Sequence, residues 1–173
     1  AQSTVIDLHA DPTLWNPKLL EADDRQAALP QLKAGGVDGV IFGIPSQGLP
    51  IIGGWAIFSW MRGFPREARR SSWAAAMHQI TTLQEAAASS KGALRLVNNA
   101  KDFRAANAAG AIAGLIGVEG GHALEGDLSR LKILKDAGVF YIGPVHLSDN
   151  DLGGSNYKLG PMGAGGGLTD LGR

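Results

Sequence analysis

Short apolar runs alternate along the chain with longer segments in which apolar residues recur every three or four positions. Five of the short runs predict strands: residues 4–9 ("TVIDLH"), 37–45 ("VDGVIFGIP"), 93–99 ("ALRLVNN"), 111–119 ("AIAGLIGVE") and 139–147 ("VFYIGPVHL"). Each run is almost continuously apolar, as in strands that are buried on both faces, and strands of this kind that alternate with helices form parallel sheets. The pattern therefore predicts an α/β fold with five parallel strands.

The longer segments predict helices over residues 17–36, 71–92, 101–110 and 127–138. Pro30 lies inside the first of these segments and is expected to kink or split it. Ser71 or Ser72 is placed to cap the second helix, and Asp127 is placed to cap the last. Gly92 and Gly138 follow the expected ends of these two helices, where glycine is the usual terminator.

Two segments do not follow this alternation. Residues 45–69 form a long, aromatic-rich loop insertion after the second predicted strand. Residues 147–173 contain eight glycines in 27 positions and predict neither strand nor helix. The aromatic residues of the first segment are expected to pack or to line a pocket, with a membrane or subunit contact as the alternative; they are Trp55, Phe58, Trp60 and Phe64.

Composition narrows the class of protein. The chain has 173 residues, enough for one domain with a substantial core, and its 45% hydrophobic and 18% charged residues are typical of a globular protein. Basic and acidic residues number 16 each, so no charge imbalance favours nucleic acid. The absence of cysteine excludes disulfides and thiolate metal sites, and no apolar run reaches membrane-spanning length. The "AQS" start fits a mature end after signal-peptide removal, which favours an exported or periplasmic location, although a trimmed chain would look the same.

Polar residues follow the first strand in a spacing that suits a metal. His9 and Asp11 are two apart, so they lie on the same side of the chain if the extended conformation persists through Ala10, and Pro12 then ends the strand. The carboxyl ends of parallel strands are where α/β folds gather their active sites. Imidazole and carboxylate ligands suit zinc, manganese or iron. The alternative is a chance His-x-Asp sequence.

Two more strands end in ionisable residues. Glu119 ends the fourth strand and precedes Gly120 and Gly121, and His146 comes near the end of the fifth. Glu119 alone could equally be a solvated loop residue, and His122 more often packs or forms hydrogen bonds in such a loop. Because three strands carry His/Asp, Glu and His at corresponding ends, together they favour a metal hydrolase.

The remaining motifs are weak. "GAGGG" (163–167) lacks the strand-to-helix context and the lysine of a phosphate-binding loop. No GxSxG sequence and no Cys–His arrangement is present.

Several stretches resemble the membrane (renal-type) dipeptidases. "IDLHADPTLW" (6–15) is similar to the "DGHNDLPW"-like opening of that family, and residues 114–155 resemble its long central signature, with the "EGGH" element and the "LTHN"-like histidine strand. "GLTDLGR" (167–173) is similar to the "GLTPFG" segment that follows. The resemblance spans the chain in order and is weak over residues 36–95.

The resemblance implies a parallel (β/α)8 TIM-type barrel that hydrolyses dipeptides with two divalent metal ions, usually zinc. Matched position by position, His9 and Asp11 would bind one ion, Glu119 would bridge both, and His146 would contact the substrate carbonyl oxygen. Residues 1–173 would be the N-terminal portion of this barrel, supplying about five strands, with 147–173 on the active-site side. The physical logic agrees, since two cations about 4 Å apart need a shared carboxylate and together acidify a bridging water.

The family takes two further histidine ligands and a proton-handling aspartate from later strands. The resemblance therefore implies a second polypeptide that carries the rest of the barrel, and a homo-oligomer is a further option. Two alternatives stay open: a truncated, non-catalytic relative that binds one metal or a partner, and a barrel metallohydrolase for another amide or ester. The unusual 45–69 loop motivates the second alternative, since it could reshape the pocket.

Overall fold

The computed structural model describes residues 3–15, 18–21, 27–46, 55–157 and 165–173 of the chain. These residues form two compact units. Unit 1 consists of Ala1–Ile44, Gln79–Gly117 and Ala137–Phe140. Unit 2 consists of Pro45–His78, Val118–Asp136 and Tyr141–Arg173.

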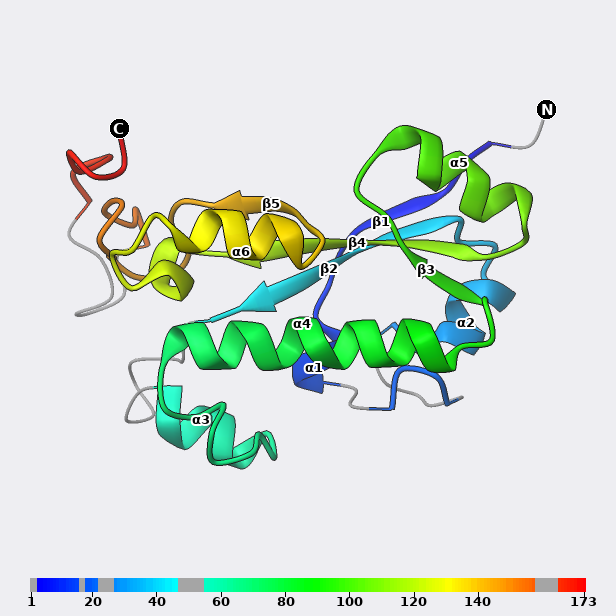
Figure 1. Ribbon diagram of the computed structural model, residues 1–173, viewed down its shortest axis with the longest axis horizontal. Coiled ribbons are helices and arrows are strands. Elements are labelled where there is room, and N and C mark those ends of the chain that lie inside the picture. Colours follow the sequence, from blue (N-terminus) through cyan, green and yellow to red (C-terminus); the bar gives the residue numbers. More distant parts are fainter. Residues whose placement is uncertain (1–2, 16–17, 22–26, 47–54, 158–164) are drawn as a thin grey trace. The chain divides into compact units, whose positions relative to one another are not determined.

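The strands are β1 (Ile6–Ala10), β2 (Gly39–Pro45), β3 (Leu94–Leu96), β4 (Ile112–Glu119) and β5 (Val139–Gly143). They form one sheet in the order β1-β2-β4-β3, and β5 also pairs with β4 (Figure 1). β1 pairs with β2 in parallel, and so does β3 with β4. The predicted five-stranded parallel α/β fold is confirmed. The neighbour order is not sequential, because β4 lies directly beside β2.

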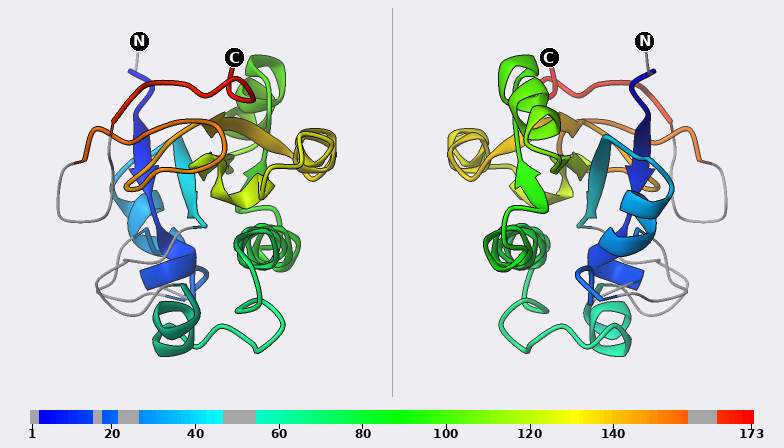
Figure 2. Two further views of the ribbon diagram at one scale, coloured as in Figure 1. Left: turned by 90° about the vertical axis from the view of Figure 1, so that its left-hand side faces the viewer. Right: turned by 90° about the vertical axis from the view of Figure 1, so that its right-hand side faces the viewer.

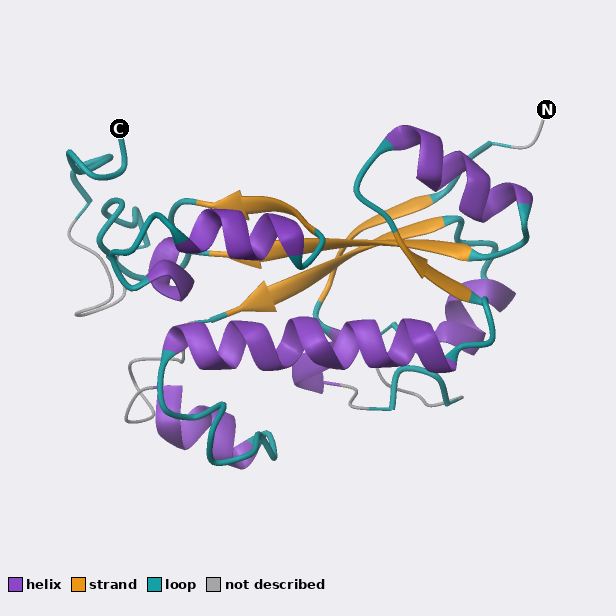
Figure 3. Cartoon of the chain, in the orientation of Figure 1, coloured by secondary structure: helices purple, strands orange, loops and turns teal. Residues whose placement is uncertain are grey.

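Helices separate the strands along the chain, as Figure 3 shows by colour. They are α1 (Pro12–Trp15), α2 (Leu29–Ala34), α3 (Trp55–Met61), α4 (Ser72–Ser89), α5 (Ala100–Ala108) and α6 (Arg130–Asp136), and a 3-10 helix, η2 (Gly121–Leu124), follows β4. None of the helices in the described part of the chain combines the length and the apolar character that a membrane crossing needs.

Most predicted helix ends are confirmed. The Ser71 hydroxyl accepts the backbone N–H of Ala74 at 3.1 Å, and an Asp127 carboxylate oxygen accepts that of Ser129 at 2.9 Å just before α6. Gly92 and Gly138 have φ values of 85° and 93°, a conformation that costs glycine little.

The helix predicted over 17–36 is wrong in its extent. A turn forms at residues 18–20, and α2 begins only at Leu29, with Pro30 in its first turn. Proline is tolerated there because the first N–H groups of a helix have no partner within it. Pro30 therefore splits the segment; residues 17 and 22–26 lie outside the described residues.

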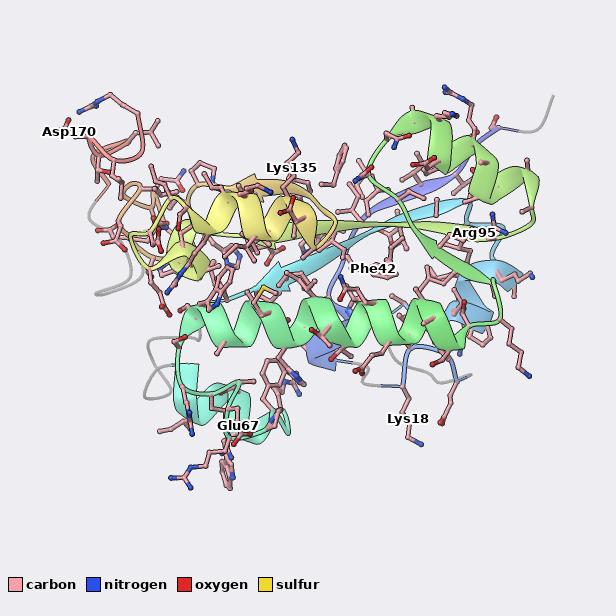
Figure 4. The ribbon with its side chains drawn as sticks, in the orientation of Figure 1. Lys18, Phe42, Glu67, Arg95, Lys135 and Asp170 are labelled. Carbon is pink, nitrogen blue, oxygen red and sulfur yellow. The ribbon has the colours of Figure 1, made fainter. Side chains whose placement is uncertain are left out.

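The core of unit 1 fills the space between β2 and α4. Alternate β2 residues Val40, Phe42 and Ile44 are buried, and so are Ile80 and Leu83 of α4. Figure 4 shows Phe42 in this layer, between the strands and α4. In Figures 1 and 2, β3 lies between α4 on one side and α5 on the other.

A glycine of β4 makes room for Phe42. A Cβ at Gly114 would lie 2.8 Å from the Phe42 ring and 3.0 Å from the Leu96 side chain. Because real Cβ atoms are essentially never that close to another atom, a larger residue at 114 would displace the ring from the core.

The expectation that every strand is buried is wrong for β1 and β5. Ile6 is 42% exposed and Leu8 68% exposed on β1, and Phe140 of β5 is 49% exposed. β1 stands at the end of the strand order, beside β2. These side chains, with Ile41, Phe103 and Leu115, line an apolar hollow of about 320 Å³ in unit 1.

The two irregular segments match their predictions in part. Residues 147–157 and 165–173 contain no strand or helix, only two isolated bridges, Asn150 with Gly153 and Gly153 with Leu168. In the 45–69 insertion, Phe64 is buried as expected, whereas Trp60 is 64% exposed and does not pack. Residues 47–54 and the side chains of Trp55 and Phe58 lie outside the described residues.

Candidate metal centre

The first pair of candidate ligands lies in unit 1, where β1 ends. The register of β1 against β2 is irregular between Asp7 and Ala10, and the backbone N–H of His9 donates to an Asp7 carboxylate oxygen at 3.0 Å. Asp11 follows the strand directly, so the strand ends before Pro12 as the sequence predicts, and Pro12 begins α1, a short helix that the sequence analysis does not predict. His9 Nε2 and Asp11 Oδ2 are 3.5 Å apart.

Two hydrogen bonds, one within the backbone and one between side chains, hold the chain at and after Asp11. The Asp11 carbonyl accepts the backbone N–H of Leu14 at 3.2 Å within α1. The Thr13 hydroxyl donates to the side-chain oxygen of Gln79 at 2.8 Å, and Gln79, on α4, is fully buried. Asp11 is therefore held by its own backbone and, two residues further on, by a hydrogen bond to a buried side chain.

The second pair lies in unit 2. Glu119 is the last residue of β4, and His146 lies three residues after the end of β5. Glu119 Oε2 and His146 Nε2 are 3.7 Å apart, which is too long for a direct hydrogen bond. The Glu119 side chain is 13% exposed and that of His146 31%, so both are shielded from solvent over most of their surface.

Gly120 separates Glu119 from the loop behind it. Its backbone has φ 86° and ψ 143°, a region that is almost confined to glycine. A Cβ at this position would lie 3.0 Å from His122 Nδ1 and 3.1 Å from His146 Cβ. The glycine therefore permits both the turn and the close approach of the two histidine-bearing segments.

His122 holds the loop, which is the alternative that the sequence favours for it. Its Nε2 lies 3.2 Å from the Ser148 hydroxyl and 3.1 Å from the Asp149 carbonyl oxygen. A carbonyl only accepts, so Nε2 carries the proton and donates to it. Burial lowers the pKa of His122 and outweighs the hydrogen bond to Asp149, which raises it. The lowered pKa favours the neutral ring.

Glu125 is a structural residue of unit 2 that no sequence pattern singles out. It has a left-handed backbone, with φ 50°. Its carboxylate accepts the backbone N–H of Trp73 at 3.1 Å and a guanidinium N–H of Arg130 at 2.8 Å, and that guanidinium lies 4.9 Å from the centre of the Trp73 ring. Burial raises the pKa of Glu125, but hydrogen bonds from Arg130, Trp73 and Ser71 outweigh it and lower the pKa.

The donor chemistry of the first pair fits a metal ion. Zinc binds histidine nitrogen and carboxylate oxygen at about 2.0–2.2 Å, so two such ligands at a tetrahedral angle are about 3.4 Å apart. The 3.5 Å between His9 Nε2 and Asp11 Oδ2 agrees with that spacing. The pair in unit 2 consists of a carboxylate and an imidazole, which are groups of the same two kinds.

Imidazole and carboxylate side chains where parallel strands end are typical of metal-dependent hydrolases built on a β/α fold. Within that class, the chain belongs to the membrane dipeptidase family (peptidase family M19), whose model matches residues 1–173. No curated protein sequence matches the chain.

Solved structures share the fold at low sequence identity. The probable dipeptidase PvdM from Pseudomonas aeruginosa is 21% identical with a TM-score of 0.75, over 98% of this chain and 42% of that one. A metallopeptidase from Rhodobacter sphaeroides, bound to a phosphinate mimic of the dipeptide L-Ala-D-Ala, is 22% identical with a TM-score of 0.73, over 99% and 54%. The dipeptidase AC, a metallopeptidase of family M19, is 21% identical with a TM-score of 0.70, over 99% and 52%. The chain thus spans about half the length of these proteins.

Proposed function

We propose that this chain carries the first part of a binuclear metal site that hydrolyses dipeptides. The observation that carries the proposal is the family match over residues 1–173. A second support is the position of the four residues at or just after the ends of strands; they are His9, Asp11, Glu119 and His146. His9, Asp11 and Glu119 supply one imidazole and two carboxylates, a donor set that suits a divalent metal ion.

The four side chains take different roles in this proposal. His9 and Asp11 bind one divalent ion, for which zinc is the best candidate because it accepts nitrogen and oxygen donors at their spacing. Glu119 would be a ligand of that ion and of a second one. Bound metal supplies a water acidified to hydroxide near neutral pH. His146 donates from Nε2 to the substrate carbonyl oxygen, where negative charge develops during attack.

The substrate class is a dipeptide, including dipeptides with a C-terminal D-residue. The ligand of the Rhodobacter sphaeroides protein, a mimic of L-Ala-D-Ala, supports this range. The family's further site residues, two histidine ligands and a proton-handling aspartate, belong to later strands of the barrel, which lie outside residues 1–173. This chain covers 42–54% of the length of the related structures.

Zinc titration calorimetry and a dipeptide assay test the proposal together. Asp11→Asn and Glu119→Gln are expected to weaken zinc binding at least about tenfold, because even loss of an outer-shell partner of a metal ligand typically costs about 10–100-fold in affinity. Glu67→Gln, which changes an exposed carboxylate of unit 2, is the matched control and should bind zinc like the unchanged chain. Equal zinc affinity in all three variants would contradict the assigned ligands.

The hydrolysis assay separates the alternatives. L-Ala-L-Ala and L-Ala-D-Ala are offered to the zinc-loaded protein. Hydrolysis of either dipeptide supports the proposal. Zinc binding without turnover favours a non-catalytic relative, and hydrolysis of other amides or esters alone favours a changed substrate.

A further inference from the structure

We propose that His122 and Ser155 are positioning residues for His146, and that they act by fixing the backbone on either side of it. The inference rests on the proposed function for the role of His146 itself. All of the contacts that carry it lie within unit 2.

The segment that carries His146 lacks a regular hydrogen-bond ladder. β5 ends at Gly143, and residues 144–149 form neither strand nor helix. In Figures 1 and 3 this loop runs beside the turn that follows β4. The orientation of His146 therefore depends on individual contacts to the loop rather than on secondary structure.

Ser155 fixes the loop at His146. Its hydroxyl donates to the His146 carbonyl oxygen at 2.9 Å, and its backbone N–H donates to an Asp149 carboxylate oxygen at 2.7 Å. The same hydroxyl accepts the backbone N–H of Tyr157 at 3.1 Å. Ser155 is 1% exposed, so water cannot easily replace these bonds when one is lost.

His122 fixes the loop just beyond His146. It lies three residues after Glu119, and its Nε2 bonds to Ser148 and Asp149, two and three residues after His146. This contact therefore connects the segment that follows Glu119 to the segment that follows His146.

Two further bonds hold the loop on its other side. The backbone N–H of Gly121 and the side-chain N–H of Asn150 both donate to the Pro144 carbonyl oxygen, each at 3.0 Å. The loop that carries His146 is therefore held by hydrogen bonds at residues 144, 146 and 148–149. The turn after Glu119 supplies two of the donors, the backbone N–H of Gly121 and Nε2 of His122. This arrangement sets the 3.7 Å separation between Glu119 and His146.

Two independent substitutions test the inference, Ser155→Ala and His122→Ala, with His122→Gln as the conservative rescue. A glutamine amide N–H can still donate to the Asp149 carbonyl. Thr169→Val is the matched control, because Thr169 also makes two hydrogen bonds in unit 2, to Asp151 and from Gly172, away from residues 144–149.

The first readout is the imidazole NMR spectrum of ¹⁵N-histidine-labelled, zinc-loaded chain. The chain has four histidines, so the His146 signal is assigned by substitution, and His78, which packs edge-on against Phe64 at 5.1 Å, is the internal reference. We expect the His146 signal to shift or broaden in both alanine variants, to return in His122→Gln and to stay unchanged in Thr169→Val.

The second readout is steady-state dipeptide hydrolysis by the zinc-loaded protein. Both alanine variants are expected to lower kcat about 10–100-fold with little change in KM, as small misplacements of a reacting group do. An unchanged His146 signal in both variants overturns the inference, and so does His122→Gln behaving like His122→Ala. If the unchanged protein hydrolyses no dipeptide, the proposed function fails, but the NMR readout still decides the positioning role. If one alanine variant does not fold, the other decides alone.

Discussion

Replacing Gly120 by alanine should destabilise unit 2 through two separable effects. The first is backbone strain, because φ 86° and ψ 143° suit glycine alone, and such conformations cost other residues about 1–3 kcal/mol. The second is overlap, since the new Cβ would meet His122 Nδ1 at 3.0 Å and His146 Cβ at 3.1 Å. Overpacking of this kind costs about 1–3 kcal/mol.

A second glycine with a positive φ, but without the overlap, serves as the comparison. Gly63, also in unit 2, has φ 75° and no atom within 4 Å of the position that a Cβ would take, so Gly63→Ala carries backbone strain without overlap. Gly120→Ala is therefore expected to lose about 1–3 kcal/mol more unfolding free energy than Gly63→Ala. Urea unfolding followed by tryptophan fluorescence measures both, because Trp55, Trp60 and Trp73 belong to unit 2. A Gly120→Ala variant that is as stable as Gly63→Ala would refute the close approach of the two histidine segments.

Three further substitutions test other parts of the fold. The pKa of Glu125 is lowered in the folded chain, so its ionised carboxylate stabilises the fold at pH values above the ordinary pKa of 4.5, and this contribution is lost as the pH falls through the lowered pKa. Glu125→Gln should therefore flatten the dependence of thermal stability on pH in that acidic range. An unchanged pH profile would contradict this role of Glu125. Thr13→Val removes the hydrogen bond to buried Gln79 and should cost about 1 kcal/mol in urea unfolding, whereas no loss would mean that this bond adds nothing to the anchoring of α1. Asn99→Ala removes the side chain that caps α5 and should cost about 1 kcal/mol, seen as an earlier loss of helical circular dichroism on heating.

Local signals explain which elements are predictable. The continuous apolar runs and the capping residues act over a few neighbouring positions, so the five strands, α4, α5 and α6 follow from the sequence. The helix predicted over 17–36 extends too far because apolar periodicity continues through a segment that Pro30 divides. The predicted burial of β1 is too high because an apolar run does not reveal whether its strand stands at the end of the sheet.

For the candidate site, the residue types and their places at strand ends can be read from the sequence. The spacing of His9 and Asp11 predicts that their side chains lie close together, and the 3.5 Å between His9 Nε2 and Asp11 Oδ2 agrees with it. Residues two apart in an extended chain point to the same side, so their proximity is a local property of the sequence. The close approach of Glu119 and His146, which are far apart along the chain, arises only in the folded protein. It depends on the pairing of β5 with β4, on the missing side chain of Gly120, and on the bonds from His122 and Ser155 to an irregular loop. Hydrogen bonds between residues distant in sequence leave no periodic pattern, which is why only the folded chain reveals them.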